Sequence, residues 1–420
     1  MDLFFHEASL LLFNSVLIPV ALFSAAFYLL AVLGIRHRTP ARYQGVAVKQ
    51  WPSVTIQIPT KNEQVAIRCA EHCLRFDYPG RFQIIIGDDS TDSEVSRAID
   101  AFARQHPNVT VTRRGSTFGY KPGNLNHMLQ FSKGEIIAIF DSDFLPPTDF
   151  LTRIVKPFVA DEKVACVQAK WDYLNIGQTR VSRFASSILM VYHHLLAPIN
   201  ERLGVSLLFG SAEAVRASAL RELGGWKDWS MTEDVEFTLR ALRAGYKSVY
   251  LSDLSVPGEV PFNLRGLSKQ QKRWAYGNAK AFFDNSRWIL FGGRFSLLQK
   301  AALLFTLVGY ISAPFLVVFM LLGIVTWFTG TPGVIDVAKF SLTTGQIFLI
   351  NSGFLAAALV ALHREKRARM IISVVGASLT YGIWVSISVF DGLMKALARK
   401  KMQWYMIRKA GNESLTLPSA

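Results

Sequence analysis

The stretch that decides the fold reads IIIGDDSTD at residues 84–92. Three consecutive isoleucines favour a buried β-strand, because β-branched side chains fit a pleated surface. Asp88 and Asp89 follow this strand directly, and open α/β sheets bind ligands beyond the carboxyl ends of their strands. A helix N-cap is the simpler explanation, but Ser90 or Asp92 alone would supply it. The two adjacent carboxylates therefore indicate a ligand-binding edge.

Similar β-branched runs recur outward from this stretch and alternate with amphipathic stretches. Strands that alternate with helices in this way predict a parallel, doubly wound α/β sheet between Trp51 and Arg265. The predicted strands cover residues 53–58, 83–87, 108–111, 135–140, 164–169 and 248–251, and the two clearest helices cover 63–76 and 92–105.

A second pair of carboxylates, Asp141 and Asp143, follows the apolar run at 136–140. Alternating carboxylates at a strand exit can share a divalent cation, and Mg²⁺ and Mn²⁺ prefer such oxygen ligands. An Asp-x-Asp pattern also occurs by chance in surface loops, but here the apolar sequence FLPP follows at 144–147. We therefore expect this pair to bind a metal ion that offsets the charge developing on a leaving diphosphate.

A third acidic site, Glu233 and Asp234, precedes an amphipathic helical stretch. For Glu233 a capping or first-turn role favoured by the helix dipole is a sufficient explanation. Asp234 has a functional alternative as a general base that takes a proton from an attacking hydroxyl group.

The stretch QQKRW at 270–274 combines basic side chains with an indole, which suits a diphosphate beside a stacked sugar ring. The net charge of +15 would also suit nucleic acid, but that function needs a basic stripe with several stacking aromatics. Here the basic residues gather at the boundaries of apolar segments, so no nucleic-acid partner is expected.

The composition indicates a membrane protein, since 50% of the 420 residues are hydrophobic and only 18% are charged. Residues 9–34 carry no charge and are long enough to span a bilayer. A signal peptide would have positive charge before the apolar run, whereas here Asp2 and Glu7 precede it and Arg36 follows. We expect a membrane anchor with Arg36 onward in the cytoplasm.

Three further apolar stretches follow the α/β region. Residues 301–328 predict either one tilted span or an interfacial turn that leads into a span, and 341–362 predict another span. If 370–390 also crossed, the basic tail from Lys395 would lie outside, against the positive-inside rule. We therefore prefer three spans in total over four, with the last stretch along the inner interface.

Two small groups of potential metal ligands have simpler explanations. Cys69 and Cys73 lie one helical turn apart without a nearby His or Cys cluster, so we interpret them as small helix residues rather than zinc ligands. His193 and His194 are neighbours that point apart on a helix, which favours packing over metal binding.

The acidic sites and the QQKRW stretch, in this order, resemble the membrane-integrated glycosyltransferases of family 2, the group of cellulose, hyaluronan, chitin and mannan synthases. The resemblance implies an α/β GT-A (Rossmann-like) cytoplasmic catalytic domain inserted between transmembrane and interfacial helices. The implied organisation is a transmembrane helix at 1–35, a basic linker at 36–51, the GT-A domain at 52–265, an amphipathic interfacial region at 266–298, transmembrane and interfacial helices at 299–397, and a gating-loop-like segment and tail at 398–420.

The resemblance also implies which residues hold the nucleotide sugar. PTKNE at 59–63 resembles the turn that cradles the nucleotide, KPGNLN at 121–126 resembles an element near the donor, and Asp88 and Asp89 resemble the site that contacts uracil or ribose. The implied donor-binding residues are Pro59, Thr60, Asn62, Glu63, Asp88, Asp89, Lys121, Asn124, Asp141, Gln270 and Arg273, and the implied metal ligands are Asp141 and Asp143.

For the acceptor and the chemistry, the resemblance implies Asp234 as the catalytic base, with Glu233 in the same Thr-Glu-Asp motif, and Trp274 beside the acceptor sugar. LFGS at 208–211 resembles the Phe-Cys-Gly-Ser element of the acceptor path, so Phe209, Gly210 and Ser211 are implied acceptor residues. QAKW at 168–171 is closer to the mannan-synthase-like branch than to cellulose or hyaluronan synthases, and WYMIRK at 404–409 aligns with a Phe-x-Val-Thr-x-Lys gating loop, with Ile407 in place of Thr.

We thus expect an inverting β-glycosyltransferase that uses Mg²⁺ or Mn²⁺ and a nucleoside-diphosphate sugar, with a UDP-sugar as the leading donor and a guanosine diphosphate sugar as the alternative. The expected acceptor is a growing polysaccharide, and the expected location is a bacterial-type inner or plasma membrane. A glycolipid synthase that adds one or a few sugars to diacylglycerol or ceramide is the main alternative. A scaffolding subunit with a degenerate domain is a further one, which the intact acidic sites disfavour.

Overall fold

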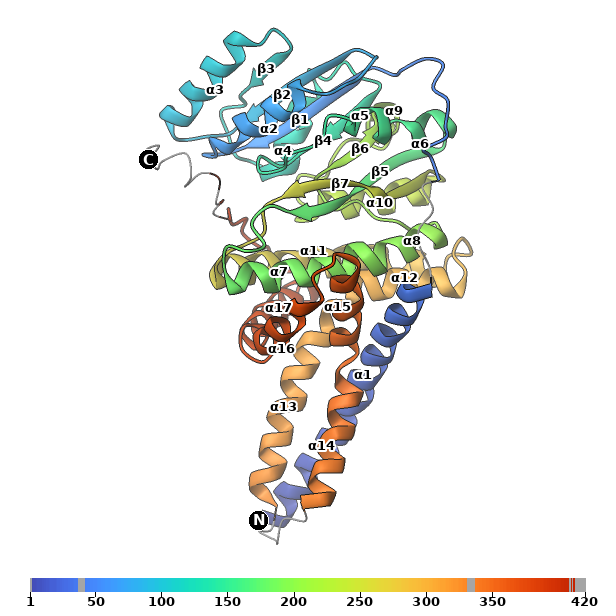
Figure 1. Ribbon diagram of the computed structural model, residues 1–420, viewed down its shortest axis with the longest axis vertical. Coiled ribbons are helices and arrows are strands. Elements are labelled where there is room, and N and C mark those ends of the chain that lie inside the picture. The colour runs from blue at the N-terminus through green and yellow to red at the C-terminus, as the bar shows by residue number, and fades with distance from the viewer. Residues whose placement is uncertain (1, 37–41, 331–336, 408, 410, 412–420) are drawn as a thin grey trace.

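The protein consists of a broad head that carries a β-sheet, a layer of helices beneath it and a narrow helical stalk (Figure 1). The structure, a computed structural model, describes residues 2–36, 42–330, 337–407, 409 and 411. Part of the predicted basic linker (37–41) and the tail from 412 lie outside the described residues.

The head is built on a seven-stranded sheet with the order β3-β2-β1-β4-β6-β5-β7. All six predicted strands are present, and the structure adds a seventh. The strands are β1 (Val54–Thr60), β2 (Phe82–Asp88), β3 (Val109–Thr112), β4 (Ile136–Ile139), β5 (Val164–Tyr173), β6 (Glu213–Arg216) and β7 (Lys247–Gly258).

The four strands β3, β2, β1 and β4 are parallel, so their carboxyl ends meet at one edge of the sheet. The register pairs Thr60 with Asp88, at the ends of β1 and β2. It also pairs Gln57 with Ile139, two residues before Asp141. The first two acidic sites therefore lie at the same edge, as the parallel arrangement predicts.

The prediction of an all-parallel sheet is wrong at β6, which runs antiparallel to both β4 and β5. The sequence EAVR of this strand has charged ends and no apolar run that would mark it. Its first residue, Glu213, pairs with Ile139 at the end of β4. Because β6 starts where β4 ends, residues 209–211 are delivered directly to the acidic edge.

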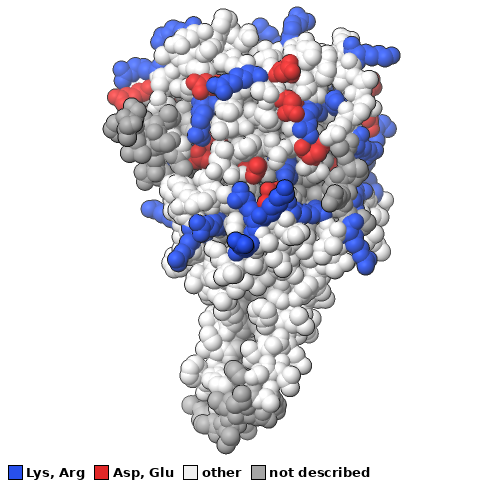
Figure 2. All heavy atoms as spheres, in the orientation of Figure 1, with Lys and Arg blue, Asp and Glu red and all other residues white. Residues whose placement is uncertain are grey.

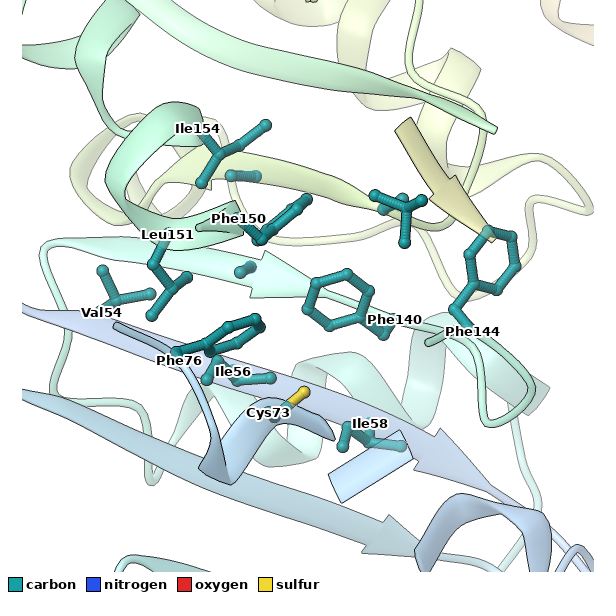
Figure 3. Close-up of a cluster of buried hydrophobic side chains, with 14 of the residues drawn as sticks. Val54, Ile56, Ile58, Cys73, Phe76, Phe140, Phe144, Phe150, Leu151 and Ile154 are labelled. Atoms are coloured by element: carbon teal, nitrogen blue, oxygen red, sulfur yellow. The ribbon is translucent and has the colours of Figure 1, made fainter. Parts of the chain in front are cut away.

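The core lies on both faces of the sheet, because successive side chains of a strand point to opposite sides. Ile84 belongs to one buried cluster and Ile85 to another. Figure 3 shows part of the first cluster, where Phe140 packs against Phe150 with ring centroids 4.8 Å apart. Cys73 lies in the same cluster, as expected for a core helix residue.

Short helices surround the sheet, and longer ones form the layer below it and the stalk. The helices of the head and the layer are α2 (Val65–Leu74), α3 (Ser93–Gln105), α4 (Tyr120–Leu129), α5 (Phe150–Ile154), α6 (Lys156–Ala160), α7 (Arg180–Val191), η1 (Tyr192–Leu196), α8 (Ala197–Leu203), α9 (Ala217–Glu222), α10 (Glu233–Ala244), α11 (Leu264–Phe291) and α12 (Leu297–Val308). Those of the stalk and its junction are α1 (Asp2–Arg36), η2 (Gly309–Ile311), α13 (Ser312–Thr329), α14 (Val337–Asn351), α15 (Gly353–Arg364), η3 (Ala368–Met370), α16 (Ile371–Ser378) and α17 (Tyr381–Leu397).

Among the described residues, two helical segments are long and apolar enough to cross a membrane, Phe4–Arg36 and Leu297–Thr329. Two bent helix pairs would raise the number to four: α14 with α15, bent by 58°, and α16 with α17, bent by 63°. Figure 1 shows α1, α13 and α14 along the stalk, whereas α16 and α17 lie near the head. The interfacial path of the last pair stays a prediction.

Helix α17 is held closely against α11. A Cβ atom added at Gly392 would lie 2.5 Å from the carbonyl oxygen of Lys272, so only glycine allows this approach. The side chains of Lys272 and Asp391 form an ion pair between the same two helices. These contacts tie the end of the chain to the helix that carries the Gln-x-x-Arg-Trp motif.

Candidate active site

Asp88 at the end of β2 is completely enclosed by hydrogen-bond donors. The Ser90 amide and the Ser96 hydroxyl donate to its carboxylate at 3.0 and 2.7 Å, and Arg113 forms an ion pair at 2.8 Å. Burial alone would raise the pKa of Asp88, but these donors outweigh it and lower that pKa. The carboxylate therefore orders the loop after β2, and its contact with a nucleobase or ribose stays a prediction.

Asp89 is bound by Arg114 with an N–O distance of 2.6 Å, and both side chains are almost buried. Arg114 also donates to the carbonyl oxygens of Phe118 and, at 2.8 Å, Tyr120. Arg113 and Arg114 are not among the site residues expected from the sequence. The sequence does contain a signal for these ion pairs. Two arginines directly follow β3, and two aspartates stand at the end of the neighbouring strand β2.

The turn after β1 is tied to the loop after β2 by Asn62. Its side-chain oxygen accepts hydrogen bonds from the amides of Thr91 and Asp92, at 2.8 and 2.9 Å. Its backbone has a positive φ of 54°, which asparagine tolerates better than most residues. Pro59 and Thr60 lie in the last two positions of β1, so the predicted nucleotide turn lies at the acidic edge.

Asn124 positions α4 rather than facing an open cleft. Its Nδ2 donates to the carbonyl oxygen of Gly87 at 2.8 Å, and its side chain is buried. A Cβ atom at Gly87 would lie 2.2 Å from Asn124 Oδ1, so the glycine permits this contact. The contact fixes the helix that carries Lys121.

Lys121 joins the second and third acidic sites. Its Nζ lies 2.7 Å from Asp141 Oδ1 and 3.5 Å from Glu233 Oε1, and it donates to the carbonyl oxygen of Gly210. Burial alone would lower the pKa of Lys121, but the carboxylates outweigh it and raise that pKa. Burial would likewise raise the pKa of Asp141, which Lys121 and Lys409 hold below its usual value.

Asp143 is 1% exposed and lies at the centre of a candidate cation site. Its Oδ1 lies 2.7 Å from Lys409 Nζ, and its Oδ2 accepts from the Glu259 amide at 3.2 Å. Glu63 also contributes to this cation site, since its negative charge acts on Lys409 and its carboxylate accepts from the Ser142 hydroxyl. Burial raises the pKa of Glu63 to about 7.

The cation site fits a divalent cation that takes some of its ligands from a substrate. No group of three or more His, Cys, Asp and Glu side chains in the described part of the chain is arranged to hold a metal ion. Asp141 and Asp143 nevertheless offer carboxylate oxygens, and Mg²⁺ is usually bound by one or two carboxylates together with substrate phosphates. The Lys409 ammonium shows that this cation site accepts positive charge.

Asp234 lies at the start of α10 and is 7% exposed. Burial, together with the charge of Glu233, raises its pKa to about 7. Gly210 closes over it with a φ of +88°, and a Cβ atom there would lie 3.3 Å from Asp234 Oδ2. Glu213, the first residue of β6, accepts from the Gly210 amide at 2.8 Å.

Aromatic side chains line the other side of residues 209–211. The ring of Phe209 lies 4.9 Å from that of Tyr192 and 6.3 Å from that of Trp171. Trp171 donates from its indole nitrogen to the carbonyl oxygen of Ser211 at 2.9 Å, and its ring lies 6.4 Å from that of Trp274. The four predicted acceptor residues therefore lie in one connected group, and Trp171 and Tyr192 extend it beyond the prediction.

Helix α11 brings Arg273 to the acidic cluster, where the charges of Glu233, Asp141 and Asp234 act on it. The Nε atom of Arg273 and the Oε1 atom of Gln270 are buried and have no hydrogen-bond partner among the described residues. Buried polar atoms without partners are uncommon in native proteins and indicate a missing ligand or water. Both atoms are therefore available to a substrate.

The C-terminal segment, which we define as the described residues 402–407, 409 and 411, crosses this site. Trp404 stacks on Tyr120 with ring centroids 5.8 Å apart, and the Arg273 guanidinium lies 4.1 Å from the Trp404 ring centre. The Gly411 amide donates to Glu259 at 2.9 Å. Arg408 lies outside the described residues, and the alignment of 404–409 to a gating loop stays a prediction.

Comparison with known proteins agrees with this geometry. The family described as "Glycosyl transferase family group 2" matches residues 136–331, which include Asp141, Asp143, Asp234 and Arg273. The matched stretch covers just under half of the chain, and the chain is similar to glycosyltransferase family group 2. The sequence resemblance to this group is thereby confirmed, as is the α/β class of the catalytic head.

Relatives within the family include plant proteins named for the synthesis of glucomannan. Glucomannan 4-beta-mannosyltransferase 7 of Arabidopsis thaliana is 33% identical over 61% of this chain and 48% of its own length. Probable glucomannan 4-beta-mannosyltransferase 11 of Oryza sativa subsp. japonica is 30% identical over 76% of this chain and 60% of its own. The chain therefore spans about half to three fifths of the length of these relatives.

Among solved structures, the mannosyltransferase PcManGT from Pyrobaculum calidifontis, in complex with GDP-Man and Mn²⁺, has a similar fold. The TM-score is 0.59 at 19% sequence identity, over 89% of this chain and 99% of that one. The likeness shows a GT-A-like fold, and it extends beyond the head.

Proposed function

We propose that this protein is a membrane-bound, inverting β-glycosyltransferase that transfers a hexose, with mannose as the first choice, from a nucleoside-diphosphate sugar to a growing polysaccharide. The names of the relatives at about 30% identity support a β-mannosyl product. The GDP-Man bound in the structurally similar mannosyltransferase PcManGT supports a guanosine diphosphate sugar ahead of the UDP-sugar favoured by sequence alone.

One observation carries the proposal: Lys121 contacts both Asp141 and Glu233, while Gly210 lies against both Lys121 and Asp234. Acidic groups from two separate elements thus surround a single point. Such a cluster suits a reaction in which a base and a leaving-group site must act on the same sugar.

In the proposed reaction Asp234 accepts the proton of the acceptor hydroxyl group. The acceptor oxygen forms a bond to the anomeric carbon, while the bond from that carbon to the phosphate oxygen breaks on the opposite face. The electron pair of the broken bond leaves with the nucleoside diphosphate. A base with a pKa of about 7 suits this role, because about half of it is ionised at neutral pH and it holds a proton well in the transition state.

The leaving diphosphate is bound by residues from helix α11 and from the segment after β4. Arg273 and Gln270 offer their buried, unpartnered atoms to its oxygens, and Arg273 adds a positive charge. Asp141 and Asp143 would hold Mg²⁺ or Mn²⁺, which neutralises negative charge on the diphosphate when bound. For that, Lys409 must leave the carboxylate of Asp143.

The acceptor lies against Trp274 and the aromatic group around Phe209, whose flat apolar faces suit sugar rings. The apolar helices hold the head at a membrane, with the head on the cytoplasmic side and residues 52–265 as the catalytic domain. A polysaccharide acceptor follows from the relatives, whereas a glycolipid product is the outcome that would correct it.

The experiment is product analysis with the purified full chain in neutral lipid vesicles. GDP-mannose, GDP-glucose, UDP-glucose and UDP-N-acetylglucosamine, each radiolabelled, are supplied in turn with Mg²⁺ or Mn²⁺. We expect labelled polymer from GDP-mannose that a β-mannanase digests, and none from an Asp234→Asn variant. Label extracted into organic solvent would favour the glycolipid synthase, and the absence of any transfer from all four donors would contradict the proposal.

A further inference from the structure

A cavity of about 990 Å³ lies outside the proposed active site, at the junction between head and stalk. One wall comes from the head, through Lys170 on β5 and His194 in η1. The other comes from the connection between α15 and η3, residues 363–369. The cavity exceeds the space that a single phosphate group requires and lies at the upper end of the usual range for ligand sites.

The position of the cavity matches the surface of a membrane. Helix α15 ends at Arg364, which donates to the carbonyl oxygen of Gly34 near the end of α1. Both helices belong to candidate spans. The cavity therefore lies at the level where these helices leave the hydrocarbon layer, and lipid headgroups occupy that level.

The cavity is strongly basic, with five Lys and Arg residues and a single carboxylate in its lining. The carboxylate, Glu365, is already shared by Lys170 at 3.2 Å and His194 at 2.6 Å. No ion pair to Lys366, Arg367 or Arg369 occurs among the described residues, and these three side chains are exposed. Figure 2 shows Lys and Arg gathered where the broad head meets the stalk.

A helix end does not account for this charge. The carbonyl end of α15 carries the equivalent of about half a negative charge, which one cation already offsets. Lys366, Arg367 and Arg369 are exposed, and all three line the same cavity. Clusters of Lys and Arg where a membrane helix meets the cytoplasm are typical binding sites for anionic headgroups.

We propose that this cavity binds the phosphate group of an anionic lipid, with Arg367 and Arg369 as its principal contacts. The same chemistry would accept free phosphate, so the source of the group is part of the test. The inference does not depend on the proposed transferase activity, because none of its lining residues belongs to the proposed donor site.

The test compares lipid retention by the full chain purified in neutral detergent. Native mass spectrometry counts phosphatidylglycerol and phosphatidylcholine molecules on the wild-type chain, on R367A/R369A and on the control K400A/K401A. The control removes two exposed cations that lie outside the cavity. We expect one retained phosphatidylglycerol on the wild type and the control, and at least tenfold weaker retention on R367A/R369A.

A parallel titration with inorganic phosphate, followed by ³¹P NMR line broadening, distinguishes the sources. Binding of the lipid at least tenfold more tightly than free phosphate identifies a headgroup site. Equal binding of both, lost in R367A/R369A, identifies a phosphate site without lipid preference. Equal retention of the two lipids by the wild type, or equal losses in the two double variants, overturns the inference; the first criterion needs no variant, so it holds even if R367A/R369A unfolds.

Discussion

At the scale of single residues, burial changes what a carboxyl group can do. Asp234, Glu63 and Asp141 are all acidic side chains near one edge of the sheet. Burial raises the pKa of Asp234 and of Glu63 to about 7. For Asp141 the neighbouring lysines outweigh the effect of burial, and its pKa falls. One site thus contains both an ionised carboxylate and carboxyl groups that titrate near neutral pH.

Replacing Asp234 with asparagine removes the proposed base but keeps the volume of the side chain. We expect the turnover rate to fall about 10²–10⁴-fold, with donor binding unchanged within a factor of about three. Turnover by product formation and binding by calorimetry measure the two quantities. Full turnover in a folded D234N protein would exclude Asp234 as the base.

The same residue predicts the pH dependence of the reaction. Only the ionised carboxylate can accept a proton, so the rate should fall about tenfold per pH unit below pH 7 and level off above it. The sign follows from the raised pKa: an exposed aspartate would stay ionised down to roughly pH 4. A profile of initial rates from pH 5 to 9 checks this, and a flat profile down to pH 5 would contradict it.

At the scale of elements, the loops after β2 and β3 depend on each other. Arg113 and Arg114 extend from the end of β3 to the two aspartates that follow β2. Removing one partner of such a pair leaves a buried charge without compensation, which costs more than the pair itself contributes.

Arg114→Met is therefore expected to destabilise the head by about 3–5 kcal/mol, because Asp89 is nearly buried beside it. Thermal unfolding followed by tryptophan fluorescence measures the change. Arg97→Met is a matched control, since its side chain is 74% exposed and lies 3.9 Å from an equally exposed Glu94. The control should change stability by less than about 1 kcal/mol; equal effects in both variants would show that the buried pair is unimportant.

A second prediction at this scale concerns the C-terminal segment. It rests on the proposed metal site. The Lys409 ammonium and a divalent cation compete for the Asp143 carboxylate. In the absence of donor, Lys409→Met should bind Mn²⁺ about tenfold more tightly, because a charge-assisted hydrogen bond contributes roughly 1.5–3 kcal/mol. Electron paramagnetic resonance of free Mn²⁺ reports the affinity without any activity assay.

Lys401→Met is the control for this measurement, since Lys401 is exposed and lies in the same part of the chain. Its Mn²⁺ affinity should equal that of the wild type. Unchanged Mn²⁺ affinity in Lys409→Met would mean that Lys409 does not compete with the metal ion for the Asp143 carboxylate.

At the scale of the whole molecule, the arrangement of head and stalk predicts the membrane topology. Helices α16 and α17 lie near the head, and α17 is fastened to α11 through Asp391 and Lys272. If this pair stays at the interface, Lys401 lies on the same side as Glu94 in the head, and His6 lies on the opposite side.

Single cysteines at positions 94, 401 and 6 test this topology in sealed vesicles. The three native cysteines are buried and should not react with a membrane-impermeant maleimide. We expect positions 94 and 401 to be labelled from one side and position 6 from the other. Labelling of 401 with 6, opposite to 94, would show that the last helix pair crosses the membrane.

The sequence alone determined the features that depend on neighbouring residues. Six strands, the acidic residues at their ends and the apolar segments follow from local patterns of side-chain type, because secondary structure and membrane partition respond to composition over a few turns. The parallel order of β1, β2 and β4 then brought the first two acidic sites together. The family resemblance added the acceptor residues Phe209, Gly210 and Ser211.

Only the tertiary structure decided the contacts between segments that lie far apart in the chain. The antiparallel β6, the two arginines on Asp88 and Asp89, the bridge made by Lys121 and the ion pair of Lys409 with Asp143 join residues that no local pattern relates. The pKa of Asp234 and the basic cavity also belong to this group. The physical reason is that burial and electrostatic interaction depend on distance in space, which the fold sets and the order of residues does not.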